Sequence, residues 1–283
     1  MPLWASLSGN TYNGRIHPDA LDDFAQFLRA TVERYDGDGH QDAPGRPIIR
    51  HWEIFNEPDN VDNRWGGYGA EYAQMLEVAY GAVKSADPNA QVLLGGLAYD
   101  WFDTQVEDGQ FDPDFLDDVL SAGGGAYFDI MNFHTYPIFA SDWDSESTGL
   151  VQKTAALRAK LSSYGFDKPM MITETGWHNG TDTLPPSSDA EQVARLVQLY
   201  AQGIAADVDV LIWFMIYDSG GFAPPYGLVT SDDPPQEKLA YYAYQAAVEQ
   251  LGDAEFVRAI GPNVSGVANM EAYQFSKDGD ALY

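Results

Sequence analysis

Short apolar runs that suit β-strands alternate with longer amphipathic segments over most of the 283-residue chain. Strands that alternate with helices in this way form βα units around a parallel sheet. Runs such as Val92-Leu93-Leu94 suit strands that are buried on both faces. The apolar spacing predicts strands over residues 48–55, 91–97, 128–133, 169–173 and 209–216, and helices over 19–35, 68–86, 113–122, 148–164, 188–206 and 237–251. The sequence therefore predicts an α/β fold with a parallel sheet.

Two of the predicted strands end in a glutamate, Glu57 and Glu174. Most of the 43 acidic residues are expected to be solvated surface charges, but a carboxylate that follows a buried strand is costly unless something uses it. Glycoside hydrolysis with retention needs two carboxyls about 5 Å apart, one protonated and one ionised. Strand ends that meet at a barrel mouth would supply them. Glu53 shares the strand face of Glu57 and is a rival carboxylate, for which we expect a paired, structural role deeper in the barrel.

Four segments, in this order, resemble the clan A glycoside hydrolases, which are retaining (β/α)8-barrel enzymes. Trp52–Pro58 resembles the fourth-strand signature of that clan, and Ile172–Trp177 resembles the seventh. His134-Thr135-Tyr136 is similar to the sixth-strand segment, and Val210–Phe214 is similar to the eighth. The resemblance covers about residues 2–250 and is nearest to families 39 and 5. It implies a TIM-type (β/α)8 barrel that hydrolyses β-linked carbohydrate.

The resemblance also implies roles for individual residues. Glu57 matches the acid/base of the clan, Glu174 matches the nucleophile, and Asn56 matches the asparagine that hydrogen-bonds the sugar 2-hydroxyl. The other implied substrate-binding residues are His134, Tyr136 and Trp213, of which Tyr136 would touch the nucleophile and Trp213 would form the floor of the sugar subsite. Trp177 is a separate candidate, not implied by the resemblance, for a subsite at the rim. Ordinary packing within the fold is the competing interpretation for His134, Trp213 and Trp177.

The strand that ends at Glu57 begins near residue 48, which is early for a fourth strand at about 30 residues per βα unit. Only residues 2–6 are left for the third strand, so we expect at most six barrel strands, without the first two or so βα units, in a chain truncated at both ends. The expected domains are an incomplete barrel over 1–251 and a β-strand tail over 252–283 that resembles the start of an accessory β-sandwich. A homo-oligomer partner or the tail is expected to cover the open barrel edges.

The formal charge of −28 argues against nucleic acid and anionic membranes as partners, because both carry the same sign of charge. The chain has no cysteine and its five histidines show no metal-ligand spacing, so we expect neither a metal nor a cofactor. No apolar stretch approaches the ~20 residues of a membrane helix, and the first residues form no signal peptide. Secreted and cytoplasmic locations both stay open. Self-repulsion of this size is relieved by salt, which favours higher stability at high ionic strength.

Two other functions compete with that of a retaining glycosidase. A truncated barrel that cannot position its carboxylates would be a weak carbohydrate binder, since a misplacement of about 1 Å can cost on the order of 100-fold in rate. An enzyme that is competent only as an oligomer lies between the two. The sequence leaves open the sugar, its linkage, and endo or exo cleavage.

Overall fold

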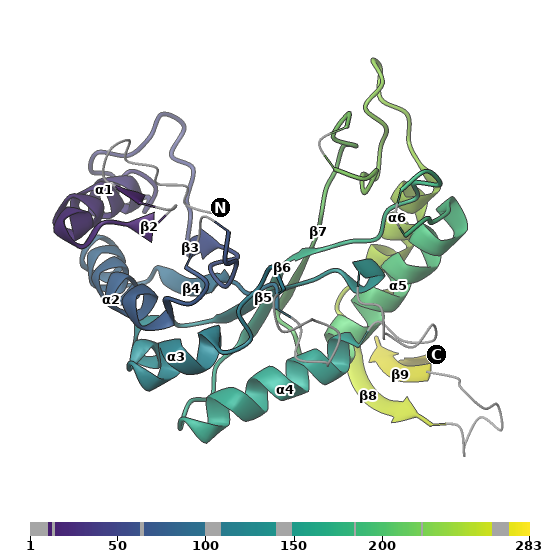
Figure 1. The fold of residues 1–283 in the computed structure, drawn as a ribbon. Helices are drawn as coiled ribbons and strands as arrows, with labels where there is room; N and C mark the ends of the chain where they lie inside the picture. The colour runs from purple at the N-terminus through teal and green to yellow at the C-terminus, as the bar shows by residue number, and fades with distance from the viewer. Residues whose placement is uncertain are drawn as a thin grey trace. The chain divides into compact units, whose positions relative to one another are not determined.

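The computed structural model describes residues 11–12, 15–62, 65–99, 109–139, 149–183, 185–221, 223–261 and 272–283 (Figure 1). The chain divides into two compact units. Unit 1 holds Met1–Trp101, Gln105–His134 and Leu157–Met171, and unit 2 holds Phe102–Thr104, Thr135–Ala156 and Ile172–Tyr283. Each unit is described separately below.

Unit 1 is built from parallel strands with helices packed beside them. Strand β3 (His51–Asn56) pairs in parallel with β4 (Gln91–Gly96), and Leu93↔Ile130 and Leu97↔Phe133 bridge β4 to the β5 region. Helix α1 (Leu21–Glu33) packs on α2 (Gly69–Ala86), which packs on α3 (Phe115–Ser121) (Figure 1). A short antiparallel ribbon of β1 (Thr11–Tyr12) and β2 (Arg15–Ile16) precedes α1.

The core of unit 1 follows the predicted apolar pattern. Val92, Leu93 and Leu94 of β4 are all at most 2 % exposed, as expected for a strand covered on both faces. On α2, Tyr72 is fully buried and its hydroxyl donates to the carbonyl of Ile54 at 2.7 Å. This hydrogen bond ties the helix to the strand that leads to Glu57.

Unit 2 contains the carboxyl-terminal part of the chain. Strand β7 (Val210–Trp213) lies next to β6 (Met170–Thr175) in a sheet of order β5-β6-β7, where β5 is Met131–Thr135. The division between the units falls inside β5 and β6. Helix α4 (Leu150–Ser163) precedes β6 in the chain, and α5 (Asp189–Ala205) packs on α6 (Leu239–Leu251).

Most predicted elements are confirmed to within a few residues at each end. All the strands expected between residues 48 and 216 and all the expected helices are present. Five consecutive strands, β3 to β7, are each followed by a helix, α2 to α6. The candidate third strand at residues 2–6 lies outside the described residues, so the six-strand count stays a prediction.

The carboxyl-terminal tail forms a small antiparallel sheet of order β10-β9-β8. Its strands are β8 (Glu255–Ile260), β9 (Ala272–Lys277) and β10 (Asp280–Leu282). Phe275 of β9 is buried, whereas Phe256 and Val257 of β8 are 40 % and 50 % exposed. The strands expected in this tail are confirmed, and the domain boundary at 251/252 stays a prediction. Among the described residues, no helix is both long and apolar enough to cross a membrane.

Candidate active site

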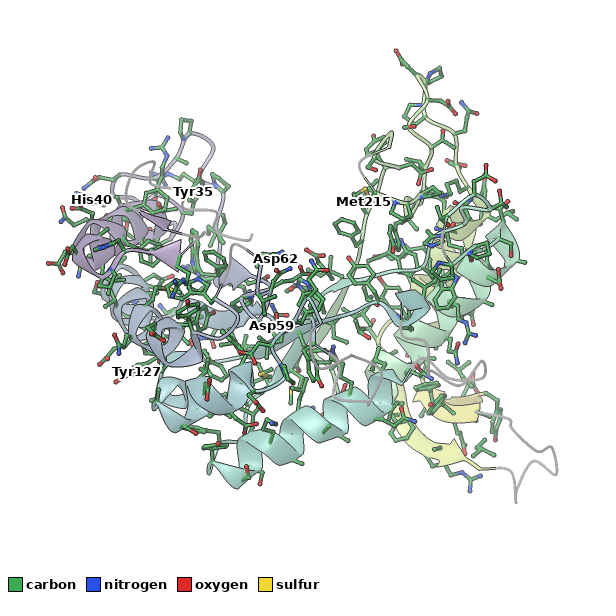
Figure 2. The ribbon with its side chains drawn as sticks, in the orientation of Figure 1. Tyr35, His40, Asp59, Asp62, Tyr127 and Met215 are labelled. Carbon is green, nitrogen blue, oxygen red and sulfur yellow. The ribbon has the colours of Figure 1, made fainter. Side chains whose placement is uncertain are left out.

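Glu57 lies on an irregular turn at the end of β3. Phe55 and Glu57 have φ angles of 77° and 45°, in the left-handed region that residues other than glycine rarely adopt. Such backbone geometry costs on the order of 1–3 kcal/mol and persists only where the surroundings enforce it. Asp59 supplies part of that enforcement (Figure 2): it is 1 % exposed and accepts hydrogen bonds from the backbone N–H groups of Ala98 and Tyr99 at 3.0 and 2.7 Å. The turn that carries Glu57 is therefore fastened to the end of β4.

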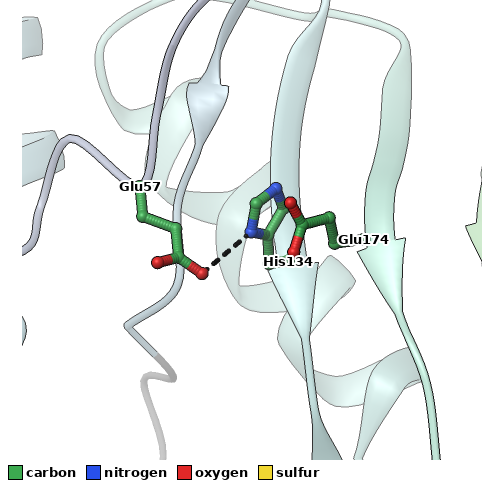
Figure 3. Close-up of side chains that lie close together, drawn as sticks. All are labelled: Glu57, His134 and Glu174. Carbon is green, nitrogen blue, oxygen red and sulfur yellow. Dashed lines mark hydrogen bonds and ion pairs between the residues drawn. The ribbon is translucent and has the colours of Figure 1, made fainter. Parts of the chain in front are cut away.

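His134 contacts Glu57 within unit 1. Its Nδ1 lies 3.1 Å from Oε1 of Glu57, and the imidazole is 1 % exposed, whereas the Glu57 side chain is 20 % exposed (Figure 3). Nε2 of His134 lies 3.9 Å from Oε1 of Glu53. The ring therefore has one carboxylate beside each nitrogen.

Two neighbours fix the place of this imidazole. A Cβ at Gly96 would lie 2.1 Å from Nε2 of His134, so only glycine leaves room for the ring. Glu53 is 4 % exposed and accepts the Gly96 N–H at 2.9 Å. The expectation that Glu53 is paired and buried is confirmed.

Glu174 is held within unit 2 by Tyr136. The Tyr136 hydroxyl donates to Oε2 of Glu174 at 2.9 Å, as the clan A resemblance implied. The Tyr136 ring meets the rings of Phe214 and Tyr226 edge to face, with centroids 6.1 and 5.6 Å away. Phe214 and Tyr226 also contact each other, at 6.0 Å. The rings of Phe214 and Tyr226 thus orient the Tyr136 hydroxyl that faces the carboxylate.

The two predicted tryptophans are both held by hydrogen bonds in unit 2. Trp213 is 7 % exposed and donates its indole N–H to the Tyr226 carbonyl at 3.0 Å. Trp177 donates to Ser187 Oγ at 2.8 Å, and the Arg195 guanidinium lies 5.0 Å from its ring centroid. Both indoles are anchored in the fold, and their contact with a sugar stays a prediction, as does that of Asn56.

The sequence interpretation missed the loop that carries Tyr226. Lys238 Nζ donates to Asp218 Oδ1 at 3.0 Å and to the Pro225 carbonyl at 3.1 Å, which fastens the segment that leads into this tyrosine. Asp218 Oδ1 also accepts the Gly227 N–H at 2.7 Å. Burial lowers the pKa of Lys238, although Asp218 acts in the opposite direction. No strand-end pattern marks this loop in the sequence, because its residues are distant in the chain from the strands they contact.

His178 is a second buried histidine that the sequence interpretation did not single out. It is fully buried, and its ring meets that of Tyr226 edge to face with centroids 5.5 Å apart. Burial lowers the pKa of His178, and the positive charge of Lys238 lowers it further. The Gly180 N–H donates to its Nδ1 at 3.2 Å, so this nitrogen acts as an acceptor.

One acidic group in unit 1 has a geometry that a cation could use. Glu33, Asp36 and Asp38 place carboxylate oxygens within 4.8 Å of one another. Glu33 is already engaged by His40 at 2.6 Å, and that carboxylate raises the pKa of the exposed imidazole. Asp36 is buried and Asp38 is exposed, and neighbouring carboxylates are expected in a chain of charge −28 whether or not they bind a cation. The absence of a metal requirement therefore stays a prediction.

Parallel strands that alternate with helices are the layout of a (β/α)8 barrel, whose active-site residues follow the carboxyl ends of the strands. The family model described as cellulase (glycosyl hydrolase family 5) matches residues 6–219. The chain therefore belongs to glycosyl hydrolase family 5. The predicted membership in the clan A glycoside hydrolases is confirmed.

One curated relative and two solved structures are also similar to this chain. A beta-xylosidase of Caldicellulosiruptor saccharolyticus is 22 % identical over 197 residues, which are 66 % of this chain and 36 % of the relative. A family 39 glycoside hydrolase of Bacteroides cellulosilyticus WH2 has a TM-score of 0.67 at 20 % identity, covering 94 % of this chain and 51 % of that one. A glucosidase of Croceicoccus marinus has a TM-score of 0.63 at 21 % identity, covering 84 % and 48 %.

These likenesses establish the fold. The predicted TIM-type barrel, present in part, is confirmed as the fold class. The chain spans about half the length of the solved structures that it resembles, and about a third of the curated relative.

Proposed function

We propose that the protein is a retaining glycosidase that cleaves β-glycosidic bonds through a covalent glycosyl-enzyme. One observation carries this proposal: the glutamates that end β3 and β6 each have a specific partner, Glu57 with His134 and Glu174 with Tyr136. A carboxylate held at a fixed orientation suits nucleophilic attack, and a carboxyl beside an imidazole suits proton transfer.

In the first step, an oxygen of Glu174 attacks the anomeric carbon while the bond from that carbon to the leaving oxygen breaks. Glu57 gives its proton to the leaving oxygen, so the alcohol departs neutral and a glycosyl ester remains on Glu174. In the second step, Glu57, now a carboxylate, removes a proton from water as the water oxygen attacks the same carbon. The ester bond breaks and Glu174 is released, so two inversions give net retention.

The remaining site residues act on the substrate in this proposal. Asn56, adjacent to Glu57, binds the sugar 2-hydroxyl. Trp213 offers an apolar surface to the sugar ring, for which an aromatic side chain is suited. Trp177 lies at the rim. The substrate is a β-linked carbohydrate, and the beta-xylosidase and glucosidase among the similar proteins make xylosides and glucosides the first ones to try.

A second candidate is an enzyme that is active only as an assembled homo-oligomer. If no assembly is active, the protein would be a weak carbohydrate binder. The observation that favours it lies on β7, where Val210 and Ile212 are 39 % and 48 % exposed on one side of the strand. Apolar strand surface of this kind is normally covered. Specific activity that rises with protein concentration would identify this case.

Initial rates on a panel of aryl β-glycosides test the proposal, with Glu174→Ala measured in parallel. We expect a rate for the wild type that falls by ~10⁴-fold or more in the variant, because the nucleophile is removed. Circular dichroism of both proteins checks that the chain is folded. A folded wild type with no rate above that of the variant, at any protein concentration, would contradict the proposal and leave the binding protein.

A further inference from the structure

A buried carboxylate of unit 1, Glu53, has no role in the proposed reaction. It lies on β3, four residues before Glu57, and is only 4 % exposed. Its Oε1 accepts the Gly96 N–H at 2.9 Å and lies 3.9 Å from Nε2 of His134. Burial of a carboxylate is costly unless its charge is used. One group that its charge faces is the imidazole that also contacts Glu57.

The two sides of that imidazole are unequal. Glu57 Oε1 approaches Nδ1 to hydrogen-bond distance at 3.1 Å, and its side chain is 20 % exposed. Glu53 faces Nε2 from the interior, where a negative charge is screened least. A neutral imidazole carries one proton, and the position of that proton is set by what faces each nitrogen.

We propose that Glu53 is a positioning residue for the acid/base: its charge keeps the proton of His134 on Nε2, so that Nδ1 accepts a hydrogen bond from the protonated form of Glu57. This inference rests on the proposed function, because it concerns the proton that Glu57 delivers. The carboxyl proton of Glu57 is then held on the oxygen nearest the ring until the leaving oxygen takes it. When Glu57 becomes a carboxylate, Nδ1 has no proton to give it, which leaves Glu57 free to activate water.

Gly96 also helps to hold His134 in place. Its N–H fixes the Glu53 oxygen, and its missing side chain leaves the space that the imidazole fills, since a Cβ there would be 2.1 Å from Nε2. The ring therefore cannot turn away from Glu53 without leaving this slot. The carboxylate, the glycine and the imidazole together define one orientation of the ring.

The dependence of rate on the leaving group tests this role. In Glu53→Gln, the amide still accepts from Gly96 but the charge is gone. We expect kcat/KM to fall by ~10- to 100-fold for a phenyl glycoside, which needs acid assistance, and by less than about 3-fold for a dinitrophenyl glycoside, which needs little. Glu53→Asp, which keeps the charge, should restore the ratio of the two rates toward that of the wild type.

Asp87→Asn is the matched control. Asp87 is a carboxylate of unit 1 that is 4 % exposed and accepts a backbone N–H, from Asn89 at 2.9 Å, next to the start of β4 rather than its end. Losing it should lower the rates on both substrates equally, if at all. Equal losses on both substrates in Glu53→Gln, or no loss, would overturn the role of Glu53.

Nitrogen NMR of the wild type gives a second test that needs no folded variant at Glu53. We expect His134, assigned by its loss in His134→Gln, to show the neutral form protonated on Nε2. A proton on Nδ1, or on both nitrogens, would overturn the inference. Failure of the proposed function is distinguishable, because the wild type would then be inactive or Glu57→Ala would lack any dependence on the leaving group.

Discussion

The two glutamates to which we assign catalytic roles, Glu57 and Glu174, differ in how the fold holds them. Glu57 lies on a left-handed turn beside an imidazole that is 1 % exposed. Glu174 lies within the regular strand β6, and its partner is a phenol set among aromatic rings. An acid/base must change its protonation state twice in each turnover, whereas a nucleophile must only keep its direction. An imidazole nitrogen that can accept the proton of a carboxyl suits the first task, and a phenol hydroxyl that donates to a carboxylate suits the second.

Among the variants that distinguish the surroundings of Glu57 from those of Glu174, we expect the largest effect from Glu57→Ala. Acid assistance is worth about 10²–10⁴-fold, so we expect a loss of that size on phenyl glycosides and a much smaller one on dinitrophenyl glycosides. Steady-state kinetics with both substrates measures it. Parallel losses of equal size would remove Glu57 from the acid/base role.

Gly96→Ala should lower the reaction rate by displacing His134, the partner of Glu57, while every carboxyl group is kept. The added Cβ would lie 2.1 Å from Nε2 of His134, so the ring must move, and a displacement of about 1 Å costs on the order of 100-fold in rate. Gly81→Ala is the control, because a Cβ there, on helix α2, meets nothing within 4 Å. A folded Gly96→Ala protein with the wild-type rate would show that the place of His134 does not matter.

Tyr136→Phe, which removes the hydrogen bond to Glu174, should lower the reaction rate by a smaller amount. A hydrogen bond to a charged group contributes about 1.5–3 kcal/mol, which corresponds to ~10- to 100-fold in the rate of glycosyl-enzyme formation. Tyr127→Phe is the matched control, since its hydroxyl donates to Glu77 at 2.8 Å on the protein surface (Figure 2). If both variants retain the wild-type rate, the Tyr136 hydroxyl has no part in holding the nucleophile.

The two buried histidines extend the same comparison to pH. His134 lies between carboxylates, whereas burial and Lys238 lower the pKa of His178. The folded state therefore binds a proton at His178 less readily than the unfolded state does. The stabilisation from neutral His178 is complete above the unfolded pKa of 6.5 and is lost as the pH falls below it.

We therefore expect the melting temperature to drop between about pH 7.5 and about pH 5.5 by more in the wild type than in His178→Gln. This is the smallest of the expected effects, because many carboxylates also titrate in a chain of charge −28. Calorimetry on both proteins measures it. An equal drop in the two proteins would show that His178 does not contribute to the pH dependence of stability.

The sequence predicted the strands and their ends well because apolar runs and turn residues are local signals. The sequence also indicated Glu57, Glu174, His134 and Tyr136 as site residues. In the structure Glu57 contacts His134, and Glu174 accepts a hydrogen bond from Tyr136. The left-handed turn at Phe55 and Glu57 was not predictable, since no glycine marks it.

Tyr226 and Lys238 escaped prediction for a different reason. They act through contacts with residues far along the chain, such as that of Tyr226 with Tyr136, and neither stands at the end of a strand. A tyrosine between prolines and a glycine reads only as part of a loop. The place of Tyr226 beside Tyr136 and Phe214 follows from tertiary packing that periodicity does not encode.

The most direct measurement is covalent trapping with an aryl β-glycoside of a fluorosugar, followed by mass spectrometry of the intact chain and its peptides. A fluorosugar slows release of the glycosyl-enzyme, so the account predicts one sugar added per chain, on the peptide that contains Glu174. The label should be absent from Glu174→Ala and present, formed from a dinitrophenyl donor, in Glu57→Ala. A label on another carboxylate, or turnover of the natural-sugar glycoside to the inverted anomer, would contradict the central claim.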